Sequence, residues 1–182
     1  MHGQGKHFLP TQIVLHYLSR SNNEWLIRMA LQSSLNHVQQ SDWGYCLPAC
    51  AQMALAQLGI TTSQRQLAKQ LGTIAKIGTP LPNVQRLEKF GVQVKQIQWQ
   101  GANAVSEALR LNRAVIAALL TSHDLPGWST LRTQHVVIIT AIDTAQISYH
   151  DPALSYGPVA VQLDAFLLAW SDMSEQAALL WK

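Results

Sequence analysis

Residues 40–50 have the sequence QSDWGYCLPAC, in which a polar loop runs into an apolar segment. Over residues 47–58 only two glutamines are strongly polar, so a helix here is apolar nearly all round and should be buried. Pro48 suits its first turn and Gly59 its end. The stretch therefore predicts a buried helix that begins where the loop ends, with Cys46 at the junction.

The chain beyond this helix predicts further helices and then strands. We expect helices at about residues 63–71, with Ser63 as the cap, 81–90 and 104–111. After residue 128 we expect strands at 135–142, 147–150, 159–163 and 177–181, and a helix at 164–170 capped by Asp164. The alternation of glutamine with apolar residues over 96–100 also predicts a strand. This order indicates an α+β fold, with N-terminal helices packed on a C-terminal antiparallel sheet.

Length and composition indicate a globular protein. The chain has 182 residues, of which 48% are apolar and 13% charged. The net charge of +3 is spread without any basic run, which argues against a nucleic-acid partner. Apolar runs such as 114–120 fall far short of the roughly 20 residues of a membrane span. We also expect no signal peptide, and only two cysteines occur, Cys46 and Cys50, so reduced thiols and a cytoplasmic location are predicted.

Residues 1–36 differ from the rest of the chain. Two short apolar patches, 13–18 and 25–31, flank the polar residues 19–23. We expect an N-terminal extension that is helical and either packs on the domain or binds a partner. Residues 37–182 would then form the domain.

Three residues suggest nucleophilic catalysis. Cys46 stands at a helix N-terminus, where the helix dipole and free N–H groups lower the pKa of a thiol, although a buried cysteine is more often a small apolar residue. His135 opens the strongest strand and can act as the base. Folding the hairpin about Asp143 brings residue 135 opposite about 151 to 154, so Asp151 lies within roughly 5 to 8 Å and can accept a hydrogen bond from the imidazole.

Acyl transfer also needs donors for the developing oxyanion. The N–H of Cys46 can share this role with a nearby side-chain amide, and Gln40 is placed for it. Glutamine is common in this chain, so a surface role for Gln40 is the alternative.

These segments resemble those of the bacteriocin-processing, double-glycine-type cysteine peptidases of the papain-like superfamily. Residues 40–50 resemble the family's Q-x5-C-G-x-A-C segment, and residues 135–143, HVVIITAID, resemble its H-[FY/V]-V-V-[IL]-x-G-[IV]-[ND] strand. The dipeptide at 151–152 is similar to its D-P segment. The resemblance covers about residue 39 to the C-terminus and implies a papain-like fold.

The resemblance also implies four roles. Cys46 would be the nucleophile, His135 the base, Asp151 the residue that orients the base, and Gln40 an oxyanion donor. Leu47 departs from the family, which usually has Gly there, and it would narrow the groove beside the nucleophile. We expect no transporter segment, so the resemblance does not imply cleavage after a double-glycine leader.

Other constellations are weaker. Seven histidines occur without HExxH or paired ligand spacing, so no metal is expected, and the absence of G-x-G-x-x-G and G-x4-G-K argues against a nucleotide cofactor. His150 should point to the face opposite Asp151 and be structural. Trp43, Tyr45 and Trp128 either shape a substrate groove or belong to the core.

Three alternative functions are compatible with these residues. The first is hydrolysis of a peptide bond in a peptide or protein substrate. The second passes the same acyl group to another acceptor, or deamidates a glutamine side chain. The third is an inactive relative that binds a leader-like peptide, a possibility that Leu47 keeps open.

Overall fold

The computed structural model describes residues 35–182, so the prediction of a helical extension over residues 1–36 falls almost wholly outside the described residues. The elements of the described part are, in order, α2 (Cys46–Gln57), α3 (Gln64–Leu71), the 3-10 helix η1 (Leu81–Phe90), β1 (Gln93–Ile97), α4 (Gly101–Arg110), β2 (Ala114–Leu120), β3 (Gln134–Ile142), β4 (Gln146–His150), β5 (Val159–Gln162), α5 (Leu163–Ser171) and β6 (Ala177–Trp181).

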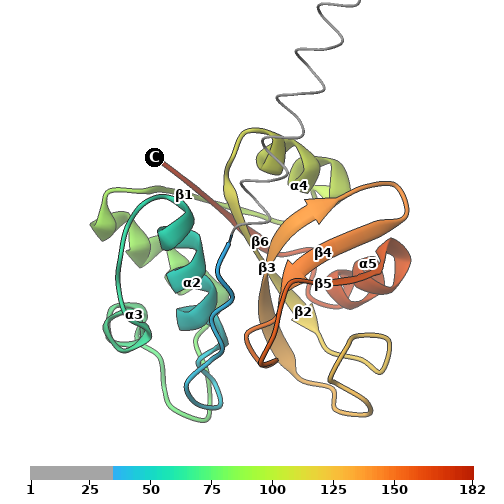
Figure 1. Cartoon of the computed structure of the whole chain (residues 1–182), viewed down its shortest axis with the longest axis horizontal. Coiled ribbons are helices and arrows are strands. Elements are labelled where there is room, and N and C mark those ends of the chain that lie inside the picture. The colour runs from blue at the N-terminus through green and yellow to red at the C-terminus, as the bar shows by residue number, and fades with distance from the viewer. Residues whose placement is uncertain (1–34) are drawn as a thin grey trace, which may run out of the picture.

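One antiparallel sheet of six strands, in the order β1-β6-β2-β3-β4-β5, forms the middle of the molecule. Helices α2, α3 and η1 pack on one face, and α4 and α5 pack on the other (Figure 1). Strand β2 lies near the centre, and its successive side chains belong alternately to the two apolar clusters. Each face of β2 is therefore buried, as its uninterrupted apolar sequence requires.

Several local predictions are confirmed. Helix α2 is buried nearly all round, and Ser63 caps α3 in a capping box with Gln66. Strands β3 and β4 form the expected antiparallel hairpin, in which Ile138 pairs with His150. The α+β prediction holds, with N-terminal helices packed on an antiparallel sheet.

Other local predictions are wrong. Strand β1 ends at Ile97, so the alternation over residues 96–100 does not continue as a strand, and Trp99 takes a positive φ of 54°. Helix α5 has Gln162 at its N-cap, with Asp164 inside the first turn and no capping hydrogen bond from a side chain. Strand β2, which precedes residue 128, is not among the predicted strands. Of the helices in residues 35–182, none has the length and apolar character needed to cross a bilayer.

Candidate active site

Cys46 is the first residue of α2, and the loop before it is held in place by backbone contacts. Gln40 N donates to Pro152 O at 2.7 Å, which ties the loop to the segment after β4. Gly44 has a φ of 85°, and a Cβ on it would lie 2.8 Å from Gly78 N. Only glycine fits this close approach. The loop therefore delivers the thiol to a fixed point at the helix N-terminus.

His135 and Asp151 meet through the β3–β4 pairing. Because Ile138 pairs with His150, residue 135 comes level with the chain just beyond the end of β4. His135 Nε2 donates to Asp151 Oδ1 at 2.6 Å, and both side chains are buried. This bond uses one ring nitrogen, so Nδ1 of His135 is the nitrogen that faces Cys46.

Trp128, from the loop between β2 and β3, contacts both members of this pair. Its Nε1 donates to Asp151 Oδ2 at 2.7 Å, and its ring lies 4.6 Å from that of His135, between ring centroids. Ala153 N adds a third donor, at 2.8 Å from Asp151 Oδ1. The carboxylate is thus fully satisfied, although it is only 1% exposed. The sequence analysis considered Trp128 as a residue near the site, but no sequence pattern predicted its hydrogen bond to Asp151.

The electrostatics favour a thiolate beside an imidazolium. Burial raises the pKa of Cys46, but the hydrogen bond and the positive charge of His135 bring that pKa below its ordinary value. Burial lowers the pKa of His135, but Asp151 and Cys46 together raise it to about 9. For Asp151, burial acts upward, and the hydrogen bond and charge of His135 hold the pKa below its usual range. His135 thus favours the charged forms of Cys46 and Asp151, and these two anions favour the charged form of His135.

Cys50, one turn further along α2, is chemically different. Its side chain is fully buried, and its Sγ donates to Val136 O at 3.4 Å. Burial raises the pKa of this thiol well above its ordinary value. The environment of Cys50 is that of an unreactive core thiol.

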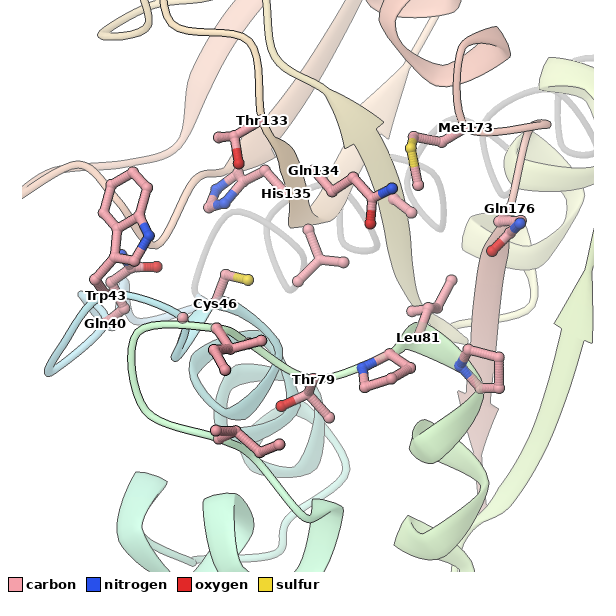
Figure 2. Close-up of a pocket in the computed structure, with 18 of the residues that line it drawn as sticks. Gln40, Trp43, Cys46, Thr79, Leu81, Thr133, Gln134, His135, Met173 and Gln176 are labelled. Carbon is pink, nitrogen blue, oxygen red and sulfur yellow. The ribbon is translucent and has the colours of Figure 1, made fainter.

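Gln40 lines the same pocket as Cys46 and His135 (Figure 2). Its Oε1 atom is buried and has no hydrogen-bond partner among the described residues. A half turn of the terminal amide keeps its shape and exchanges this acceptor for the Nε2 donor. The geometry thus brings all four predicted residues, Cys46, His135, Asp151 and Gln40, to one place.

The pocket has a volume of about 530 Å³. Trp43 and Trp128 both line it, whereas Tyr45, the third aromatic considered for the substrate groove, does not. Leu47 does not line it. Its side chain is fully buried among the core residues of α2, so the prediction that Leu47 narrows the groove is wrong.

His150 points away from this site. Its Nδ1 lies 3.1 Å from Nδ1 of His37, and the two rings are stacked. Burial lowers the pKa of His150 to about 4, so this ring is neutral at ordinary pH. Within the described part of the chain, no group of three or more His, Cys, Asp or Glu side chains is arranged to hold a metal ion.

Comparisons with known proteins bear on the fold and the family. A model of the Peptidase C39-like family matches residues 33–178. A crystal structure described as a C39-like peptidase from Bacillus anthracis superposes with a TM-score of 0.66 at 17% identity, covering 82% of this chain and 96% of the other. The peptidase domain of Streptococcus ComA, a bifunctional ABC transporter of a quorum-sensing pathway, gives a TM-score of 0.65 at 20% identity, covering 81% of this chain and 98% of that domain.

The search of curated proteins gives no match. The two structural likenesses establish the fold, and the family model confirms the predicted family resemblance. Since the family model spans most of the sequence, this chain belongs to the Peptidase C39-like family.

Proposed function

We propose that this protein is a cysteine peptidase in which Cys46, His135 and Asp151 act as a triad and Gln40 completes the oxyanion hole. One observation supports this above the others: the Cys46 thiol at a helix start and the His135 imidazole line one open pocket, and the buried Asp151 carboxylate bonds to the imidazole from behind. A buried cysteine with a purely structural role needs neither the charge partner nor the opening.

The reaction begins with attack by the Cys46 thiolate on the carbonyl carbon of the scissile peptide bond. The backbone N–H of Cys46 and the amide of Gln40 donate to the developing oxyanion. The imidazolium of His135 gives its Nδ1 proton to the leaving amine as the C–N bond breaks, which leaves a thioester on Cys46. Water then loses a proton to the neutral His135 and attacks the thioester, so that the C–S bond breaks and the thiolate and imidazolium form again. The product leaves as a carboxylic acid, which loses its own proton to solvent.

Asp151 acts on His135 alone. By accepting from Nε2–H it fixes the ring so that Nδ1 faces Cys46, and its charge stabilises the imidazolium. Trp128 and Ala153 hold the carboxylate in turn. The proton that moves during the reaction therefore stays on the Nδ1 side of the ring.

The test is digestion of a mixed peptide library by the whole protein, with the new termini identified by mass spectrometry. We expect cleavage by the native protein and none by Cys46→Ala. Adding an acceptor amine separates hydrolysis from acyl transfer, because an acyltransferase would give mainly the amide product. Binding of peptides without any turnover or thiol labelling would instead indicate an inactive relative.

The domain boundary and the location are part of the same proposal. We propose that residues 37–182 are the peptidase domain and residues 1–36 an extension, and the start of the family match at residue 33 supports a boundary close to this point. We further propose a cytoplasmic location, because the nucleophile works only as a reduced thiol.

A further inference from the structure

We infer that the pocket beside Cys46 takes a bulky, uncharged side chain from within two residues of the cleaved bond, so the substrate is an apolar peptide segment and not a double-glycine sequence. This inference rests on the proposed peptidase function and adds the chemistry of its substrate.

The pocket extends well past the nucleophile. In Figure 2, Leu81, Met173 and Gln176 lie on the opposite side of Cys46 from Gln40 and Trp43, and all of them line the same pocket. Its volume of about 530 Å³ falls in the range of about 300 to 1,000 Å³ that holds sizeable ligands. A substrate backbone fills only part of this space. Two glycines would leave the remainder to water, whereas a leucine-sized side chain would occupy it.

The walls of this far end combine apolar side chains with the uncharged amides of Gln134 and Gln176. Leu81 from the start of η1, Ala118 from β2 and Val136 from β3 are all at least nine-tenths buried and line the pocket, and Met173 closes it from the turn after α5. Each square ångström of apolar substrate surface buried here contributes roughly 25 cal/mol to binding. An apolar side chain is therefore the occupant that these walls favour.

The lining carries no charge apart from the catalytic pair. Among the described side chains that line the pocket, only Cys46 and His135 ionise near neutral pH. A charged substrate side chain would lose its hydration here without gaining a partner, which is costly. The positive charge of His135 is already balanced by Asp151 and the Cys46 thiolate. The pocket should therefore discriminate against Asp, Glu, Lys and Arg.

The wall that carries Met173 and Gln176 is fixed before any substrate arrives. Gln176 O accepts from Trp170 Nε1 at 3.0 Å and from Ala118 N at 3.0 Å, which ties this turn to α5 and β2. Gln176 N in turn donates to Met173 O at 3.2 Å. A wall held by these bonds costs little to organise on binding, so its shape can select substrates.

The mouth of the pocket continues the apolar surface. Ile74 and Ile77 line it and are 58% and 80% exposed, which is unusual for side chains of this size. Their loop is held by the close approach of Gly78 to Gly44. Exposed apolar side chains at the rim of a pocket favour an apolar partner. Ile74 and Ile77 therefore extend the preference for apolar substrate residues beyond the one side chain that binds at the far end of the pocket.

The test measures how fast short peptidyl chloromethyl ketones label Cys46 in the full chain. One series varies the residue next to the electrophile and a second varies the residue before it, through Leu, Gly, Asp and Lys. Each rate is divided by the rate with iodoacetamide, which needs no pocket. In at least one series we expect the leucine probe to react about tenfold or more faster than the other three.

Equal relative rates, or a fastest rate for the glycine probe in both series, would overturn the inference while leaving the peptidase proposal intact. If iodoacetamide labels Cys46 no faster than Cys50, the proposed function itself fails and this inference falls with it.

Gln176→Glu provides an isosteric test of the pocket, because it adds one negative charge to the wall. We expect it to lower the relative rate of the leucine probe, and to raise that of the lysine probe, by about fivefold or more each. Gln162→Glu makes the same chemical change at an exposed residue outside the pocket and should alter neither rate by more than about twofold. Met173→Glu should repeat the Gln176→Glu result. Unchanged probe preference in both pocket variants would refute the inference.

Discussion

Replacing Asp151 by Asn tests the charge balance of the site most directly. The variant keeps the size of a side chain that is only 1% exposed but removes its negative charge 2.6 Å from His135 Nε2. Burial alone would lower the pKa of His135, yet its pKa is raised from 6.5 to about 9. A rise of this size corresponds to about 3 kcal/mol in favour of the imidazolium.

Asp151 supplies the largest of the influences that raise this pKa, and Cys46 the next. We therefore expect Asp151→Asn to lower the pKa of His135 by at least about one unit, or about 1.4 kcal/mol. Activity requires the Cys46 thiolate and the His135 imidazolium together. It rises with pH as Cys46 loses its proton and falls again as His135 loses its proton. The falling limb, which lies near pH 9 in the native protein, should move to lower pH in the variant.

The assay is kcat/KM against pH from about 5 to about 10, on a peptide found in the library digest, at matched folded fractions. We expect at least a tenfold loss at the optimum, because the ring also loses its orientation. Asp143→Asn is the matched control. Asp143 accepts from Ala145 N and Gln146 N in the hairpin turn, and its loss of charge should change kcat/KM less than about threefold.

His150→Ala should also stay within about threefold, since this ring contacts His37 and not the triad. An Asp151→Asn protein with a normal rate and a normal pH profile would refute the reasoning. At most a dyad of Cys46 and His135 would then remain.

Three further predictions concern neighbouring groups. Iodoacetamide should label Cys46 much faster than Cys50, whose pKa is raised by burial, and mass mapping that finds equal or reversed labelling would exclude Cys46 as the nucleophile. Gln40→Ala should cost about 10² to 10³ in kcat while Cys46 alkylation and thermal stability persist, and an unfolded variant or an unchanged kcat would show that Gln40 is no oxyanion donor. Trp128→Phe should lower the unfolding free energy in urea by about 1 to 3 kcal/mol, because Asp151 Oδ2 loses its donor, and it should not move the falling pH limb downward. An unchanged unfolding free energy would mean that water replaces the indole.

The sequence predicts best those features that depend on local pattern. The buried helix α2 follows from its apolar composition, and the β3–β4 hairpin from two apolar runs around a turn. Strand β2 is not predicted as a strand, because it is covered on both faces and shows no alternation. Residues 96–100 do alternate, yet the strand ends at Ile97, since beyond that point the chain turns into α4.

The candidate site likewise contains some contacts that the sequence predicts and one that it does not. The spacing of the hairpin is enough to bring Asp151 to His135, but the third partner, Trp128, comes from a loop whose sequence has no periodicity. Only the folded path of that loop brings its indole to the carboxylate. The prediction that Leu47 narrows the groove is wrong for a different reason. A motif alignment places it beside the nucleophile, but neighbouring residues on a helix point about 100° apart, so Leu47 enters the core while Cys46 faces the pocket.

The same helical geometry explains why the thiol and the imidazole meet at all. Cys46 and Cys50 lie four residues apart, on one face of α2 and about 6 Å apart along its axis. The bond from Cys50 Sγ to Val136 O joins the buried apolar side chains of α2 in setting the rotation and height of α2 against β3. Cys46 is one turn nearer the helix start and His135 one residue nearer the strand start, so the packing that places Cys50 beside Val136 also brings Cys46 to His135. The second cysteine is an unreactive core thiol, yet the packing around it helps to position the reactive one.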